Sequence, residues 1–397
     1  MVQIISMALL LACAEPMASA ADAEKEVSSG ILVRAISAIH PVLSADEQVH
    51  LVYELEVVNH SSLLISVDRV EALSGAGGRL VELDGDALAM RIVVSGGETG
   101  KVFAPSHSGY IYMDISVPRA STLPTTIRHR ISTTSQRPAK PGDEHHATTD
   151  PSATVKEPAG TFLGAEVTVD PSPAIAIAPP LRGQNWLVAN GCCDELNGHR
   201  ITVFAINGAL SAPEKFAIDF VQLDREHRLL SGPIDRLSSY AYYGVPIYSV
   251  ADGTVVSVED GAPEQTPGAL PTGMTPATAA GNHIIVNLGN RRFAMYAHLQ
   301  PGSIPVKAGD RVRRGDVFGK VGNSGNTTNP HLHFHITDRP SVLAGDGLPF
   351  VIEDFKSAGA VTELGALFEG KPGNLDIKRA GRHLRRLPLN NSVVSFE

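Results

Sequence analysis

The sequence predicts a mostly β protein with at least two domains. Short segments in which apolar and polar residues alternate recur along the chain, and β-branched residues are frequent in them. Clusters of turn residues separate these segments, drawn from 37 glycines and 27 prolines. Few stretches keep a helical period for long. A length of 397 residues suggests two or three domains, each with enough material for its own core.

The N-terminal residues predict export. Val2–Cys13 is an apolar run too short to span a bilayer, and we expect no transmembrane segment. Ala18–Ala20 has the A-x-A pattern that precedes signal peptidase cleavage, so we predict a signal peptide over residues 1–20. The protein is then periplasmic or extracellular. Leu10–Cys13 also resembles a bacterial lipoprotein box, and the alternative is a lipid anchor at Cys13 with attachment to the outer membrane.

Residues 30–135 are predicted to form an immunoglobulin-like β-sandwich. Alternating runs such as Val49–Val58 and Tyr110–Ile115 are separated by turn clusters such as Ser74–Gly78. A fold alone assigns no activity, so we expect this domain to position the rest of the chain or to bind a partner. The Pro-rich residues 136–180 are predicted to be a loop or linker.

Residues 181–355 are predicted to form a second β domain, which carries the chemistry. An insertion, Gly261–Gly281, interrupts a hairpin between Val258 and Ile284, and its four prolines exclude regular structure. We expect it to form one wall of a substrate groove or, equally, to be a mobile surface loop. Residues 356–397 form a tail, with a short helix expected around Leu375–Leu387.

Three histidines share one face of a predicted strand in this domain. In residues 331–337, His331, His333 and His335 alternate with apolar residues, and same-face side chains on a strand stand about 6.5–7 Å apart. One histidine can therefore bind a metal while its neighbour acts on the water or the substrate. His298 ends another strand-like run upstream. Alone, the pattern also fits a half-exposed strand that carries histidines.

The order of motifs resembles that of the lysostaphin-like (LytM-type) zinc metallopeptidases. That family has a Y-x-H-L strand, a glycine-spaced repeat and a terminal H-L-H-F, which match Tyr296–Leu299, residues 309–325 and His331–Phe334. The resemblance covers roughly residues 186–355, less than half of the chain. It implies a lysostaphin-type antiparallel β-sheet peptidase domain.

The resemblance also implies a zinc ion held by two histidines and one aspartate. Carried over by position, Asp219 and His333 are metal ligands, while His298 and His331 are catalytic and act on the water and the transition state. One position departs from the pattern, because Lys215 stands where the family has the first metal-binding histidine. His283 and His335 match no family role, and we expect both to be structural.

We place the missing ligand at His199. Residues 200–206 and 215–220 look like strands, with turn residues between them. If they form an antiparallel hairpin centred on Ala209, His199 lies opposite Asp219, with Cβ atoms about 4.5–5.5 Å apart. Both side chains then reach one zinc ion. The alternative is that His199 only caps a strand.

The charge argues against nucleic-acid binding, and the cysteine content argues against a disulfide framework or a cysteine metal site. The formal net charge is −9 and the pI about 5.9, which gives no basic footprint for nucleic acid. Basic residues cluster near the C-terminus, where we expect a solvated helix face. Cys192 and Cys193 are adjacent, and neighbours rarely bridge, so neither a disulfide framework nor a C-x-x-C metal site is expected.

The sequence suggests three possible functions. The first is an exported zinc metalloendopeptidase that hydrolyses short peptide bonds, in peptidoglycan cross-links or in a protein substrate. The second is a catalytically inactive LytM-type module that binds and regulates a cell-wall hydrolase. Lys215 favours the inactive module, and the retained site residues favour the enzyme. The third, a lipoyl- or biotinyl-type carrier, is rejected because it needs a lysine at a hairpin tip and does not need H-x-H.

Overall fold

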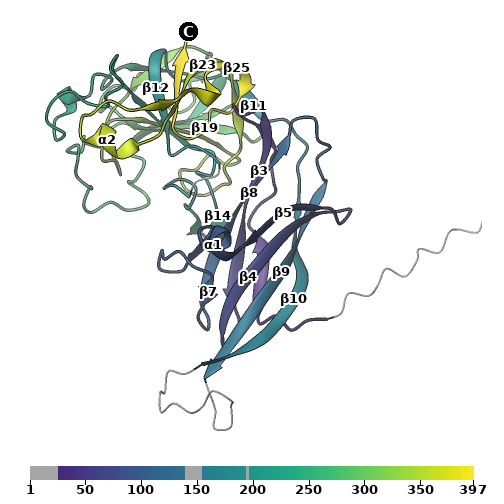
Figure 1. The fold of residues 1–397 in the computed structure, drawn as a ribbon. Helices are drawn as coiled ribbons and strands as arrows, with labels where there is room; N and C mark the ends of the chain where they lie inside the picture. Colours follow the sequence, from purple (N-terminus) through teal and green to yellow (C-terminus); the bar gives the residue numbers. More distant parts are fainter. Residues whose placement is uncertain (1–25, 139–153, 194–195) are drawn as a thin grey trace, which may run out of the picture.

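Two β domains, an elongated sandwich and a rounder sheet domain at one of its ends, make up the computed structural model (Figure 1). It describes residues 26–138, 154–193 and 196–397. The predicted signal peptide and the alternative lipid anchor at Cys13 lie outside the described residues. Within the described ranges, no helix has the length and apolar character needed to cross a membrane.

Two antiparallel sheets form the N-terminal domain, which confirms the predicted sandwich. The first sheet contains β1 (Ile31–Ala35), β2 (Val42–Leu43), β3 (Gln48–Asn59), β6 (Ile92–Val94) and β8 (Ser108–Pro118). The second contains β4 (Leu64–Ser74), β5 (Arg79–Asp84), β7 (Val102–Phe103), β9 (Thr126–Pro138) and β10 (Thr154–Thr168), and a short helix, α1 (Gly85–Ala89), follows β5. Inward-facing aliphatic residues such as Leu51, Val67 and Ile111 are fully buried between the sheets.

The sandwich extends beyond residue 135, so the linker expected over residues 136–180 is wrong for residues 136–138 and 154–168, which belong to β9 and β10. β10 pairs with β9 from Thr154 to Thr168. β10 is an edge strand, where prolines are tolerated, and the pairing shifts register just after Pro158.

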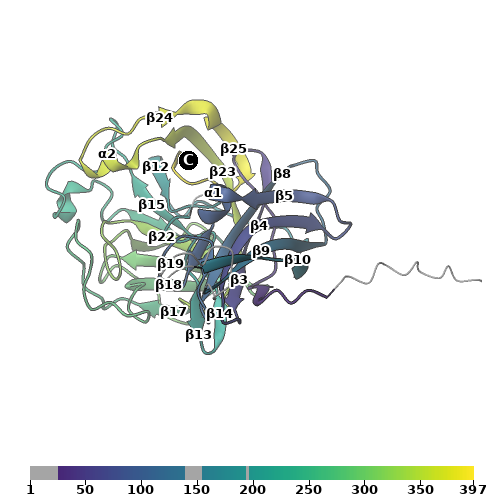
Figure 2. The ribbon, with the colours of Figure 1, turned by 60° about the horizontal axis from the view of Figure 1, so that its bottom comes forward.

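The second domain is built on a 12-stranded sheet with the order β11-β23-β26-β12-β15-β22-β19-β18-β17-β20, and β24 and β25 both pair with β23. Figure 2 shows β12, β15, β22, β19, β18 and β17 side by side. The strands are β11 (Ile175–Ile177), β12 (Gly183–Ala189), β15 (Ile218–Gln222), β17 (Gly253–Glu259), β18 (Asn282–Asn287), β19 (Phe293–Leu299), β20 (Arg311–Val312), β22 (Leu332–Thr337), β23 (Phe350–Val361), β24 (Leu375–Asp376), β25 (Gly381–Arg386) and β26 (Ser392–Phe396).

One small hairpin, a separate two-stranded sheet and short helical segments complete this domain. The hairpin is β13 (Phe204–Ile206) with β14 (Ala209–Ser211), the two-stranded sheet is β16 (Pro246–Tyr248) with β21 (Val317–Lys320), and the helical segments are η1 (Leu237–Ser239), α2 (Leu364–Phe368) and η2 (Ile377–Arg379). All sheet pairs are antiparallel except β11 with β23. One face of β22 packs into the core, where the Phe334 ring lies 5.0 Å from Tyr296 and 5.2 Å from Phe350. The opposite face carries the histidines, as the alternation predicted.

The helix expected around Leu375–Leu387 is wrong. The segment forms β24, the single turn η2 and β25, and both strands pair with β23. β23 offers unpaired backbone groups along its edge, and pairing with them satisfies the segment's own backbone. Arg382 also pairs with Asp354 on β23, so the basic residues lie along a strand rather than a helix face.

The two domains share a continuous apolar core at their junction. Val42, Ala45 and Val52 of the sandwich belong to the same buried cluster as the core of the sheet domain. Backbone hydrogen bonds cross the junction as well: Ala45 N donates to Leu387 O at 3.0 Å, and Leu387 N donates to Leu43 O at 3.0 Å. The junction is therefore a packed interface rather than a flexible tether.

Candidate metal centre

The centre of the sheet brings predicted site residues together through strand register. His333 on β22 lies opposite Asp219 on β15, and on its other side opposite Ala297 on β19. His298 follows Ala297 with a positive φ of 62°, which departs from the extended strand. The His298 ring centroid lies 4.6 Å from that of His331 and 5.7 Å from that of His333. Residues from three neighbouring strands thus converge on one face of the sheet.

Asp219 is the centre of this cluster. His199 Nε2 lies 3.3 Å from Asp219 Oδ2, while His331 Nε2 at 3.3 Å and His333 Nδ1 at 3.0 Å face Oδ1. Asn190 Nδ2 also donates to Oδ2 at 2.8 Å. Burial works to raise the pKa of Asp219, but the imidazoles of His199 and His331 outweigh it and hold that pKa well below its usual range.

His199 reaches Asp219, but not by the predicted route. Asp219 pairs with Ala189 on β12, and the hairpin forms between β13 and β14, around Asn207 and Gly208. His199 lies in a turn before β13. Residue 215 is not in a strand, because a turn with Ala217 N donating to Glu214 O precedes β15. The hairpin register that led to His199 is therefore wrong, although the two side chains meet.

Two overlapping sets of side chains bring their potential ligand atoms within 4.8 Å of one another: His199, Asp219 and His333, and His298, His331 and His333. Only the first contains a carboxylate. Two imidazoles and one carboxylate form a common ligand set of catalytic zinc, which leaves a position for water. These residues are compatible with a zinc ion by donor type and by proximity.

The outer nitrogens of these histidines have partners that fix the ring orientation. His199 Nδ1 donates to Asn190 O at 3.0 Å, which leaves Nε2 facing Asp219. His333 Nε2 lies 2.8 Å from His335 Nδ1, which leaves Nδ1 facing Asp219. Such outer partners orient metal-binding imidazoles. Sequence reasoning left His335 without a role, and its spacing two residues from His333 was the signal that could have found it.

The environments of His298 and His331 differ. Burial, with the neighbouring His331 and His333, holds the pKa of His298 well below its usual value. Burial also lowers the pKa of His331, but Asp219 outweighs it and the net shift is upward. Nδ1 of His298 donates to Ser324 O at 2.8 Å, and Nδ1 of His331 donates to Asn329 O at 2.8 Å. At neutral pH His298 is therefore neutral, with Nε2 able to accept a proton.

The cluster lines a cavity of about 400 Å³. Leu270, Ala279 and Ala280 of the Gly261–Gly281 insertion line one part of it, and Val342 and Leu343 line another. The insertion therefore borders the candidate site. An apolar lining around a few convergent polar groups is typical of a ligand site.

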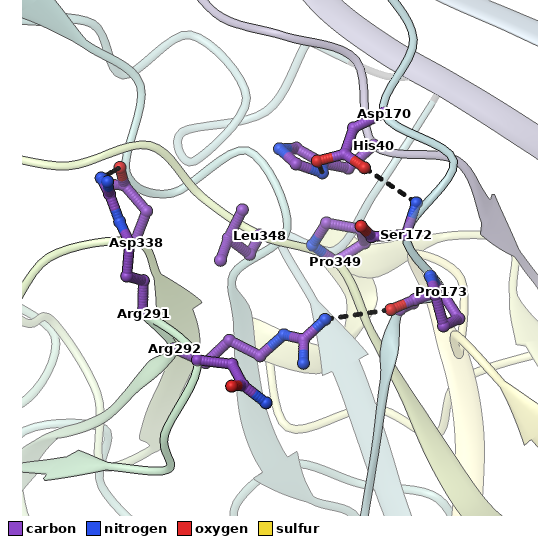
Figure 3. Close-up of a pocket in the computed structure, with 11 residues that line it drawn as sticks. His40, Asp170, Ser172, Pro173, Arg291, Arg292, Asp338, Leu348 and Pro349 are labelled. Atoms are coloured by element: carbon purple, nitrogen blue, oxygen red, sulfur yellow. Dashed lines mark hydrogen bonds and ion pairs between the residues drawn. The ribbon is translucent and has the colours of Figure 1, made fainter.

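A second cavity, of about 300 Å³, contains none of the predicted site residues. Its charged groups face one another (Figure 3): Arg291 pairs with Asp338 at 3.2 Å, and Arg292 donates to Pro173 O at 3.2 Å. His40 Nδ1 lies 3.6 Å from Asp170. This cavity is lined by groups that partner each other and offers no reactive cluster.

A third grouping, His50, Asp114 and Cys193, also brings potential ligand atoms within 4.8 Å. Both ring nitrogens of His50 are engaged, Nδ1 with Asp114 at 3.0 Å and Nε2 with Asp46 at 3.2 Å. Cys193 forms a disulfide with Cys192, contrary to the expectation that these neighbours do not bridge. We interpret this grouping as a structural ion-pair network.

Comparison with known proteins identifies the domain around this cluster. Residues 237–343 match Peptidase family M23. The chain is similar to the peptidoglycan DD-endopeptidase ShyA of Vibrio cholerae, at 33% identity over 96 residues, which are 24% of this chain and 18% of that protein. It is also similar to the glycyl-glycine endopeptidase ALE-1 of Staphylococcus capitis, at 33% identity over 120 residues, 29% of this chain and 27% of that protein.

Among solved structures, the catalytic domain of lysostaphin from Staphylococcus simulans aligns over 36% of this chain and 80% of that chain, at 22% identity and a TM-score of 0.22. This chain spans less than a third of the length of the curated relatives described above. The matched residues hold His298, His331 and His333, while His199 and Asp219 lie before them. Over residues 237–343, the chain therefore carries a domain of peptidase family M23.

Proposed function

We propose that this protein is an exported zinc metalloendopeptidase that hydrolyses peptide cross-links of peptidoglycan. The observation that carries the proposal is the convergence of His199, His331 and His333 on the buried carboxylate of Asp219, at the wall of a cavity. His199, Asp219 and His333 would hold the zinc ion. When bound, zinc polarises a carbonyl and lowers the pKa of a water molecule.

His298 and His331 have the complementary catalytic roles in this proposal. His298 is neutral, and its Nδ1 donates to Ser324 O, so its Nε2 is free to take a proton as general base. Asp219 raises the pKa of His331, which favours the protonated ring and makes Nε2 a donor for developing negative charge. Leu270, Ala279 and Ala280 of the Gly261–Gly281 insertion line the cavity together with Val342 and would form part of its wall around a bound peptide.

The contacts of Lys215 support the enzyme over an inactive regulatory module. Lys215 Nζ donates to Ser37 Oγ at 2.8 Å and pairs with Glu54 at 2.9 Å, both in the N-terminal part of the chain. The position of the family's first histidine is thus used for a domain contact, while His199 supplies an imidazole at Asp219. The names of the relatives, a peptidoglycan DD-endopeptidase and a glycyl-glycine endopeptidase, support a cell-wall peptide as the substrate class.

The test uses the full chain. Purified protein should bind one zinc ion and release soluble peptides from peptidoglycan sacculi, measured by chromatography. Asp219→Ala and His333→Ala should lose both properties. His283→Ala is the matched control, because His283 bonds Gly281 O at 2.9 Å and does not line the cavity. Stoichiometric zinc without hydrolysis of sacculi or of a protein substrate would instead support the regulatory module.

A further inference from the structure

A buried ion cluster joins the sandwich to the turn that carries His199. Glu54, on β3, is fully buried, and Arg200 and Lys215 are 2% and 3% exposed. One Glu54 oxygen pairs with Arg200 Nη1, and the other lies 2.9 Å from Lys215 Nζ. Burial alone would raise the pKa of Glu54, but Lys215 and Arg200 hold it below its usual value. A buried carboxylate with two cations is stable only while all three remain.

Further hydrogen bonds connect the turn that carries His199 to the sandwich. Arg200 Nη2 donates to Tyr53 O at 3.1 Å and to Met113 O at 2.9 Å. Tyr112 OH donates to Ile201 O at 3.0 Å. The two residues that follow His199 are thus held by β3 and β8 of the other domain.

His199 differs from the other candidate ligands in how its backbone is held. Asp219 and His333 lie on central strands whose position is fixed by ladder hydrogen bonds on both sides. His199 lies outside any strand, in a turn closed by Thr202 N donating to His199 O at 3.1 Å. Within the sheet domain its ring is oriented by Asn190 O, and Asn197 anchors the turn by donating from Nδ2 to Gly191 O at 2.8 Å. The side chain of Arg200, the next residue, is held across the domain junction.

We infer that Glu54 is a positioning residue for the metal centre: by fixing Arg200 and Lys215 it holds His199 against Asp219, and the N-terminal sandwich thereby completes the zinc site. This inference rests on the proposed zinc site. None of the sandwich residues in the cluster lines the catalytic cavity, so the effect is transmitted through the turn. It gives the sandwich a role that its fold alone does not assign.

The experiment measures zinc affinity of the full chain by competition with a chelator. Glu54→Gln should weaken zinc binding by up to about 10-fold, the lower end of the effect of losing a direct outer partner of a ligand, because Glu54 acts on His199 through Arg200 and the turn. Glu54→Asp should recover part of the affinity, because it restores the charge. The Co²⁺-substituted Glu54→Gln protein should also show an altered visible absorption spectrum, which a general loss of stability would not produce.

Glu71→Gln is the matched control. Glu71 is also a buried sandwich glutamate, 9% exposed, but it pairs with Arg130 at 3.2 Å within the second sheet and should leave zinc affinity unchanged. If Glu54→Gln does not fold, Tyr112→Phe decides, because it removes only the hydrogen bond to Ile201 O; it should weaken zinc binding several-fold. Unchanged affinity and spectrum in the folded variant overturn the inference. If the wild-type protein itself does not bind zinc, the proposed function is overturned instead.

Discussion

His335 Nδ1 lies 2.8 Å from His333 Nε2, on the side of the His333 ring opposite to Asp219. Both rings are buried, and burial with the neighbouring His333 holds the pKa of His335 well below its usual value. His335 is therefore a neutral acceptor that orients a candidate metal ligand. Its own Nε2 has no partner among the described residues.

The first prediction concerns this pair. His335→Leu removes the acceptor and should weaken zinc binding about 10- to 100-fold, because His333 is no longer held in one ring orientation. His335→Gln offers an acceptor and should retain most of the affinity. Chelator competition measures both. Equal zinc affinity in wild type and His335→Leu would return His335 to a purely structural role.

The second prediction separates catalysis from metal binding. His298→Ala and His331→Ala should each lower kcat about 10²–10⁴-fold, the usual contribution of a positioned acid–base group, while zinc remains bound. Metal analysis and hydrolysis of sacculi are measured on the same samples. Loss of zinc from His331→Ala would make it a ligand and would favour the set His298, His331 and His333.

The third prediction concerns proton release. Burial lowers the pKa of His199, but Asp219 outweighs it and raises that pKa to about 9 in the metal-free protein. At pH 7 the ring is then protonated, and zinc binding must displace about one proton from it. Calorimetry in buffers of different ionisation enthalpy should show this release at pH 7 and its disappearance as the pH rises above about 9. Proton release that does not change with pH over this range would contradict the assignment of His199.

The fourth prediction concerns the sandwich. Burial lowers the pKa of His50, but Asp114 and Asp46 outweigh it and raise that pKa to about 9. Since the folded-state pKa exceeds the ordinary histidine value of 6.5, the stabilisation is fully present below that pH and is lost as the pH rises through about 9. The difference in unfolding free energy between wild type and His50→Gln should shrink by about 3 kcal/mol from pH 6 to pH 10. If denaturant titrations give the same difference in unfolding free energy at pH 6 and at pH 10, the prediction is contradicted.

The histidine face of β22 could be predicted from sequence because a strand's alternation depends only on neighbouring residues. The contact of His199 with Asp219 was reached through a wrong hairpin, since the turn before β15 and the pairing with β12 depend on distant segments. β10 and β25 were missed for the same reason: an edge strand is decided by its partner strand as much as by its own residues.

The role of Lys215 could not be predicted from the residues near it in the sequence. Its partner Glu54 is 161 positions away, in another domain. From sequence, a lysine at that position indicated either a substitute histidine elsewhere or a degenerate metal site. In the fold Lys215 belongs to the buried ion cluster with Glu54 and Arg200, next to the proposed ligand His199.

The strand order of the large sheet determines when the second domain can be completed during synthesis. β26 (Ser392–Phe396) lies between β23 and β12, and β12 in turn pairs with the strand that carries Asp219. The strands around β23 can therefore join β12 only after residue 396 has been synthesised, whereas the sandwich needs nothing beyond residue 168 for its two sheets. Domains fold as units during synthesis, N-terminal first. The strand order therefore allows the two sheets of the sandwich to form before the sheet of the second domain is complete.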